Sequence, residues 1–180
     1  TGDITDKMRK RIHANSVVVD YQIKTSTDAF HRVISQIKRL IANCHITALV
    51  VDDSTSISQY LAEVLQKHCF TTVECKQPST VIRLIEENPD IKLILVDGEL
   101  EQASGIELTK QIRKSFAQRN PIIIGISGVY TREQSVAFLK AGANDFLTKP
   151  ILVEELIARI NQNLNMYEYN QQLEDLVDTQ

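Results

Sequence analysis

The chain has 180 residues, of which 43% are hydrophobic, and a formal net charge of −3. This length and apolar content exclude a disordered chain and favour one domain with additional material, and no apolar run reaches the roughly 18 residues of a membrane span. The acidic balance argues against a nucleic-acid-binding protein. Three cysteines without a CxxC motif indicate reduced thiols in a cytoplasmic protein, and the four histidines match no zinc-ligand spacing.

The first 45 residues differ from the rest of the chain in charge and contain a partial repeat. Residues 1–45 carry a net charge of +4, which leaves −7 for the remainder. Residues 17–26 (VVVDYQIKTS) parallel residues 142–151 (GANDFLTKPI), because an Asp, an aromatic residue and a Lys recur at the same spacing in both. This internal repeat predicts that residues 1–45 are the C-terminal remnant of a preceding domain of the same kind. A helical arm with a chance match is the alternative.

Three elements are expected in this N-terminal remnant. They are a helix at residues 6–15, a strand at residues 17–23 and an amphipathic helix at residues 27–43. Thr25 stands where the second copy of the repeat has a proline.

From residue 46 onward, short apolar runs alternate with segments of helical periodicity. Three of the five runs are apolar almost throughout, as in parallel strands that are covered on both faces. The β-α alternation repeats five times, so the predicted fold is α/β with a doubly wound, five-stranded parallel sheet. The expected strands are residues 47–51, 71–75, 92–96, 121–127 and 144–148.

Helices are predicted between these strands from apolar residues three or four positions apart. Thr131 has the spacing of a capping box with Gln134 and would begin the fourth helix, which Gly142 would end. The helical segments include residues 57–65, 108–116, 131–141 and 151–165.

Polar side chains stand where four of the predicted strands end. Asp52 and Asp53 follow the first strand, Asp97 the third, Ser127 ends the fourth and Lys149 follows the fifth. Each alone is also explained by an ordinary polar turn. However, the carboxyl ends of parallel strands meet at one edge of the sheet, where such folds bind ligands. Because carboxylates suit Mg²⁺, and a lysine and a hydroxyl suit a phosphoryl group, the sequence predicts a site for both.

Residues 46–165 resemble the receiver domains of bacterial two-component response regulators. Asp53 and Asp97 are 44 residues apart, Ser127 follows after 30 more, and Lys149 after a further 22. These intervals are typical of the family. The resemblance implies a (βα)5 flavodoxin-like receiver fold and a Mg²⁺-dependent transfer of a phosphoryl group to Asp97. The donor would be a sensor histidine kinase or a phosphotransfer protein.

The resemblance also gives each site residue a role. Asp97 would be the phosphoacceptor and a metal ligand, while Gly105, eight residues after it, and Pro150, in a motif similar to the family's fifth strand, would be structural. The other implied roles are Asp53 as a direct and Asp52 as a water-mediated metal ligand, the Glu99 backbone carbonyl as a further metal ligand, Ser127 and Lys149 as phosphoryl contacts, and Phe146 as the aromatic switch.

Residues 166–180 are predicted to extend the last helix as a linker. Four apolar residues there follow the 3-4-3 spacing of a heptad seam, although a terminal helix packed on its own domain is the alternative. By resemblance, tandem receivers followed by such a helix carry a diguanylate cyclase (GGDEF) output, which would make the parent protein an enzyme. Residues 1–180 themselves would catalyse only their own phosphotransfer and dephosphorylation. A homodimer is expected through the linker helix or through the face of the fourth helix, fifth strand and fifth helix.

Two other functions remain open at this stage. One is a pseudo-receiver that acts only as an interaction module, because Leu100 and Glu101 replace the family's usual Met-Pro pair and Ser58 stands where an arginine is frequent. The other is a phosphatase of the haloacid dehalogenase class, which requires Asp-x-Asp, whereas Asp52 and Asp53 are adjacent. Dinucleotide binding is not supported, since no GxGxxG follows any predicted strand.

Overall fold

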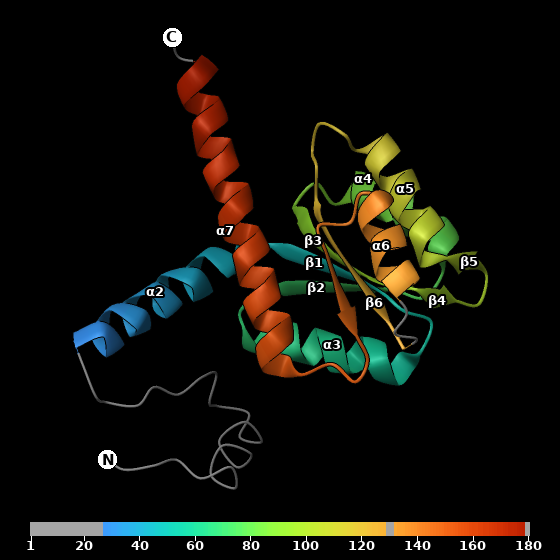
Figure 1. Cartoon of the computed structure of the whole chain (residues 1–180), viewed down its shortest axis with the longest axis horizontal. Helices are drawn as coiled ribbons and strands as arrows, with labels where there is room; N and C mark the ends of the chain where they lie inside the picture. Colours follow the sequence, from blue (N-terminus) through green and yellow to red (C-terminus); the bar gives the residue numbers. More distant parts are fainter. Residues whose placement is uncertain (1–26, 129–131, 179–180) are drawn as a thin grey trace, which may run out of the picture.

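The computed structural model describes residues 27–128 and 132–178. The helix expected at residues 6–15, the strand at 17–23 and the Thr131 cap lie outside these ranges. Five parallel strands form one sheet in the order β2-β1-β3-β6-β7 (Figure 1). This confirms the predicted doubly wound α/β fold, and every strand begins and ends within one residue of its expected position. The strands are β1 (Thr47–Val51), β2 (Thr71–Cys75), β3 (Ile91–Asp97), β6 (Ile122–Ser127) and β7 (Asp145–Thr148).

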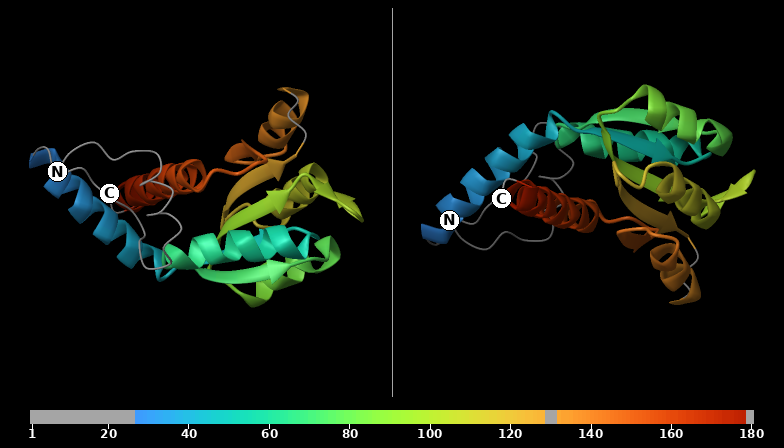
Figure 2. Two further views of the ribbon diagram at one scale, coloured as in Figure 1. Left: turned by 90° about the horizontal axis from the view of Figure 1, so that it is seen from below. Right: turned by 90° about the horizontal axis from the view of Figure 1, so that it is seen from above.

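Helices cover both faces of the sheet. α3 and α7 pack on one face, and α4, α5 and α6 pack on the other (Figures 1 and 2). α2 precedes β1 and projects from the sheet (Figure 2). A 3₁₀ turn, η1 (Pro78–Thr80), leads into α4. The helices are α2 (Thr27–Asn43), α3 (Thr55–Lys67), α4 (Val81–Glu87), α5 (Gly105–Ser115), α6 (Arg132–Lys140) and α7 (Val153–Asp178).

Side chains of the central strands alternate between two hydrophobic cores. In β1, Ala48 and Val50 join the core under α3 and α7, whereas Leu49 and Val51 join the core under α4, α5 and α6. All four are fully buried. A strand covered on both faces has no polar side, which explains why β1 is apolar from Ala48 to Val51.

Gly142 ends α6, as the sequence predicted. It has a left-handed backbone, with φ of +101°, which glycine adopts without steric cost. The Gly142 amide donates to the Leu139 carbonyl at 3.0 Å, and the Ala143 amide donates to the Phe138 carbonyl at 3.0 Å. These two bonds pair backbone carbonyls at the end of the helix and turn the chain into β7.

A short hairpin between β3 and α5 was not predicted. Its strands are β4 (Glu99–Leu100) and β5 (Ala103–Ser104), which pair antiparallel. Strands of two residues carry no periodic hydrophobic pattern, so sequence periodicity does not reveal them. The hairpin follows Asp97 directly and so lies beside the predicted site.

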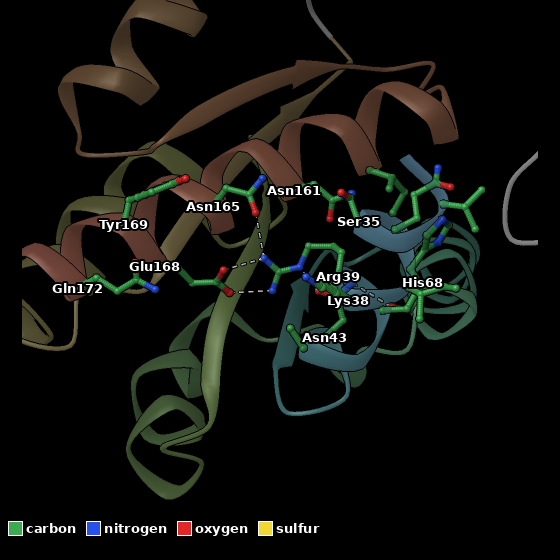
Figure 3. A pocket seen from close by; sticks show the side chains of 16 residues that line it. Ser35, Lys38, Arg39, Asn43, His68, Asn161, Asn165, Glu168, Tyr169 and Gln172 are labelled. Carbon is green, nitrogen blue, oxygen red and sulfur yellow. Dashed lines mark hydrogen bonds and ion pairs between the residues drawn. The ribbon is translucent and has the colours of Figure 1, made fainter. Parts of the chain in front are cut away.

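Contacts of Arg39 join α2 to α7 across an open cleft (Figure 3). The Arg39 guanidinium forms two hydrogen bonds to the Glu168 carboxylate, at 2.7 and 3.0 Å, and a third to the Asn165 side chain at 3.2 Å. It also donates to Asn43 within α2 at 3.0 Å. Both predicted helices, at residues 27–43 and beyond residue 165, are present. Among the described helices, none is both long and apolar enough to cross a membrane.

Candidate functional site

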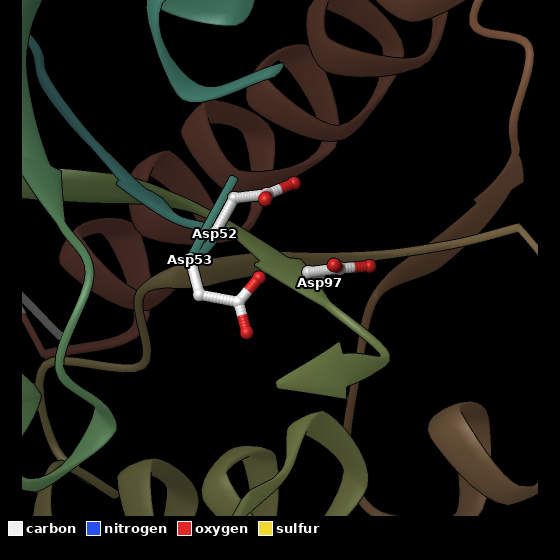
Figure 4. A group of neighbouring side chains, drawn as sticks. All are labelled: Asp52, Asp53 and Asp97. Atoms are coloured by element: carbon white, nitrogen blue, oxygen red, sulfur yellow. The ribbon is translucent and has the colours of Figure 1, made fainter. Parts of the chain in front are cut away.

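Three aspartates gather at the carboxyl ends of β1 and β3. Asp52 and Asp53 directly follow β1, and Asp97 is the last residue of β3, the strand paired with β1. One carboxylate oxygen from each lies within 4.8 Å of the other two, and the three side chains are neighbours at the strand ends (Figure 4). Asp52 and Asp97 are buried, and Asp53 is partly buried. The strand topology therefore concentrates three carboxylates at one site, which we call the acidic pocket (Asp52, Asp53 and Asp97).

Lys149 supplies a positive charge to this pocket from the end of β7. Its Nζ lies 3.2 Å from Asp52 Oδ2 and 3.1 Å from Asp97 Oδ1. The Lys149 amide donates to the Ser127 carbonyl at 2.8 Å, which fixes the backbone beside β6, and the following peptide bond to Pro150 is cis. Burial alone would lower the pKa of Lys149, but the contacts with Asp97 and then Asp52 outweigh it and raise the pKa. The ammonium is thus held in its charged form.

Asp52 lies in an environment that disfavours its charge. Burial raises the pKa of Asp52, and the amide of Ser54, which donates to Asp52 Oδ1 at 2.8 Å, lowers it. The negative charge of Asp97 raises the pKa further, Lys149 lowers it, and the net change is a raised pKa. A cation in the pocket would offset this repulsion.

Asp53 accepts a hydrogen bond that the sequence did not indicate. The Glu101 amide, at the turn of the β4–β5 hairpin, donates to Asp53 Oδ2 at 2.7 Å. This bond ties the hairpin to the acidic pocket. Glu99, in β4, has an exposed side chain. The role of its backbone carbonyl as a metal ligand stays a prediction.

Gly105 lies under the backbone of Asp97, where no side chain fits. A Cβ at Gly105 would collide with the Asp97 carbonyl, and the Gly105 amide donates to the Gly98 carbonyl at 3.3 Å. Glycine at this position therefore lets α5 begin directly beneath the pocket, which gives a physical basis to the structural role expected of it.

Ser127 and Phe146 both contact α6. Ser127 is fully buried, and its Oγ donates to Gln134 Oε1 at 2.9 Å. Phe146 is partly buried and packs on Phe138 of α6, with ring centroids 5.5 Å apart. The sequence predicted a capping box of Gln134 with Thr131 and did not indicate the contact with Ser127. Ser127 ends a strand and Gln134 lies in the following helix, so no shared periodicity relates the two side chains.

The oxygen donors of the pocket fit a hard divalent cation. Mg²⁺ binds carboxylate oxygens and keeps several waters, so one or two of these aspartates, together with water, are suitable ligands. Asp97 Oδ1 is buried and accepts no hydrogen bond within the described residues, although Lys149 balances its charge. Asp52, Asp53 and Asp97 could therefore hold Mg²⁺.

Residues 48–161 match the family model described as the response regulator receiver domain. Among curated proteins, the phosphate regulon transcriptional regulatory protein PhoB of Escherichia coli (strain K12) is 35% identical over 113 residues, which cover 62% of this chain and 48% of PhoB. The PhoB of Klebsiella pneumoniae is 34% identical over the same length. The matched region therefore spans about half the length of these relatives.

Solved structures give a longer match. A chain described as a two-component system response regulator/GGDEF domain protein is 34% identical, with a TM-score of 0.84, over 93% of this chain and 68% of that chain. A CheY-like receiver domain protein from Methanospirillum hungatei JF-1 is 26% identical, with a TM-score of 0.63, over 69% of this chain and 98% of that chain. The first match extends well beyond the part covered by the family model.

Proposed function

The chain belongs to the response regulator receiver family of two-component systems, and from this premise we propose that it accepts a phosphoryl group on Asp97. The donor would be the phosphohistidine of a sensor histidine kinase or of a phosphotransfer protein, the partners with which receiver domains in general interact. The observation that carries the proposal is the position of the Asp97 carboxylate, which lies among Asp52, Asp53 and Lys149 at one end of the sheet.

In the proposed reaction, an Asp97 carboxylate oxygen attacks the phosphorus of the phosphohistidine. A P–O bond forms while the P–N bond breaks, and its electron pair stays on the imidazole nitrogen. Lys149, already 3.1 Å from Asp97, would pair with the negative charge of the transferred group. When bound by Asp52, Asp53 and Asp97, with the Glu99 carbonyl as a further ligand, Mg²⁺ would supply charge neutralisation.

We also propose the route by which phosphorylation changes the surface. The phosphoryl group would attract the Ser127 hydroxyl away from Gln134, and Phe146 would follow, so that the face of α6, β7 and α7 adopts its second arrangement. Such a change requires that the phosphoryl group favour one of two pre-existing states. Amide exchange on this face, with and without a beryllofluoride phosphoryl mimic, tests the proposal, and identical exchange would contradict it.

The exposed seam on α7 is the proposed linker to an output domain and the proposed dimer contact. Met166, Tyr169, Leu173 and Leu176 are each at least 60% exposed and follow a heptad spacing. The GGDEF domain named in the description of the matched structure supports a diguanylate cyclase as the output of the longer protein. Sedimentation of the phosphorylated and unphosphorylated chain tests the dimer, and a monomer in both states would contradict it.

The central experiment is incubation with acetyl phosphate and Mg²⁺, followed by intact mass measurement. We expect one added phosphoryl group that is lost with EDTA and in Asp97→Asn. Glu101→Gln is the matched control, because its side chain is exposed next to the pocket while its amide can still reach Asp53. It should be phosphorylated like the parent chain. No added mass in the parent chain would instead favour the pseudo-receiver that serves only as an interaction module.

A further inference from the structure

Two of the three cysteines lie together, before the amino ends of β1 and β2 and so at the end of the sheet opposite the acidic pocket. Cys44 follows the end of α2, and Cys69 lies in the turn between α3 and β2. Both are exposed, whereas Cys75 is buried in the core under α4 and α5. The two thiols are close enough to affect each other, and the Cys44 thiol donates to the Leu40 carbonyl at 3.3 Å.

Hydrogen bonds on both sides hold the two cysteine segments alongside each other. Before the pair, Asn43 Nδ2 donates to the His68 carbonyl at 3.0 Å. After it, the Thr71 amide donates to the Ile46 carbonyl at 3.1 Å, where β1 and β2 begin to pair. Chains paired in this way run roughly 4.8 Å apart, which suits the roughly 4.4–6.8 Å between the Cα atoms of a disulfide.

Cys69 occupies a backbone position at which glycine is usual. Its φ is +68°, in the left-handed region. The Cys69 amide donates to Gln66 and the Phe70 amide to Leu65, at 3.0 and 3.1 Å, the paired bonds that close a helix with a left-handed residue. Glycine would relieve the strain at this position but would remove the thiol.

We propose that Cys44 and Cys69 form a reversible disulfide on exposure to a peroxide, and that this bond fastens the end of α2 to the α3–β2 turn. The site uses none of the residues of the acidic pocket, so the proposal is independent of phosphorylation at Asp97. Two bracketing hydrogen bonds and two neighbouring, exposed thiols carry it.

The chemistry requires one peroxide and both thiols. The thiolate of one cysteine attacks a peroxide oxygen, the O–O bond breaks, and a sulfenic acid and water result. The second sulfur then attacks the sulfenic sulfur, the S–S bond forms and a second water leaves. Two electrons pass from the sulfurs to the peroxide. Partial burial of the sulfur, and then the adjacent Cys44, raise the pKa of the Cys69 thiol.

The test uses the full chain, treated with hydrogen peroxide and then alkylated under denaturing conditions. The expected result is a loss of about 2 Da, a peptide linking Cys44 to Cys69, and alkylation of Cys75 alone. Dithiothreitol should restore three alkylation sites. In Cys69→Ser and in Cys44→Ser no disulfide should form, and dimedone should trap the remaining cysteine of the pair as a sulfenic acid.

Slower amide exchange at residues 41–46 in the oxidised chain, reversed by dithiothreitol, would support the fastening of α2. Peroxide treatment that yields disulfide-linked dimers, linkage to Cys75, or three free thiols would overturn the proposal. Circular dichroism should show that the parent chain and both serine variants are folded. A folded parent chain that forms no disulfide would then contradict the proposal. Acetyl phosphate labelling of the oxidised chain should equal that of the reduced chain.

Discussion

Replacing Asp97 by asparagine should stabilise the chain when no cation is present. Three carboxylate oxygens lie within 4.8 Å of one another. At an effective dielectric constant of about 20, the repulsion energy of each such pair of charges is about 3.5 kcal/mol. The total repulsion of Asp97 by Asp52 and Asp53 is therefore about 7 kcal/mol. Lys149, at 3.1 Å from Asp97, returns about 5 kcal/mol of attraction. The balance of about 2 kcal/mol is unfavourable before the burial of the charge is counted.

Asp97→Asn removes this charge and keeps the shape of the side chain. We therefore expect the free energy of unfolding in EDTA to rise by about 1–2 kcal/mol, which corresponds to a melting temperature higher by about 2–8 °C for a chain of this size. In the parent chain, magnesium at ten times its dissociation constant should add about 1.4 kcal/mol. Asp97→Asn has one carboxylate fewer and should gain less stability from magnesium. The difference in the free energy of unfolding between the variant and the parent chain should therefore be smaller in magnesium than in EDTA.

Urea denaturation in EDTA and in magnesium measures both effects. Asp145→Asn is the matched control, because Asp145 forms its ion pair with Arg159, outside the acidic pocket. That variant should not be stabilised in EDTA and should respond to magnesium like the parent chain. If Asp97→Asn is less stable than the parent chain in EDTA, or if magnesium stabilises both equally, the electrostatic account of the pocket is wrong.

Three further predictions concern single contacts. Because burial raises the pKa of Asp52 above 3.8, the folded state binds the Asp52 proton more tightly than the unfolded state does. Without a cation, the free energy of unfolding should therefore fall as the pH rises through the raised pKa. Urea denaturation at several pH values should show a weaker pH dependence of this free energy in Asp52→Asn. Gln134→Ala, which removes the acceptor of the Ser127 hydroxyl, should lower the free energy of unfolding by about 1 kcal/mol, while Gln134→Glu, which keeps an acceptor, should lower it less. A double-mutant cycle of Arg39→Ala and Glu168→Ala should give a coupling energy of about 0.5–1 kcal/mol that decreases with salt. A coupling energy of zero would mean that the ion pair between α2 and α7 does not contribute to stability.

The strands could be predicted closely because burial on both faces leaves a direct trace in the sequence. Ile122, Ile123 and Ile124 are fully or almost fully buried and face opposite sides of the sheet in turn, so a continuous apolar run identified the strand. The gathering of Asp52 and Asp97 followed from the same pattern, since both stand at the carboxyl ends of parallel strands.

Other parts of the site could not be predicted, because they depend on side-chain directions and on loop conformation. The bond from the Glu101 amide to Asp53 exists only because the two-residue strands β4 and β5 fold back on the pocket. The ion pair of Arg39 with Glu168 joins residues 129 positions apart, and neither residue belongs to a motif. Contacts of this kind follow from the folded chain and leave no periodicity in the sequence.

The orientation of α2 supports the interpretation of the N-terminal residues as the end of another domain. Its apolar residues Phe30, Ile37 and Ile41 are 68%, 51% and 61% exposed, whereas Arg39 and Asn43 face the receiver. At about 100° per residue, the apolar stripe lies nearly opposite Arg39 and Asn43. In α7, the corresponding apolar stripe is buried on the sheet. An amphipathic helix that turns its polar side to the attached domain leaves its apolar side for a different partner, and the sheet of a preceding receiver is the partner that the repeated sequence motif predicts.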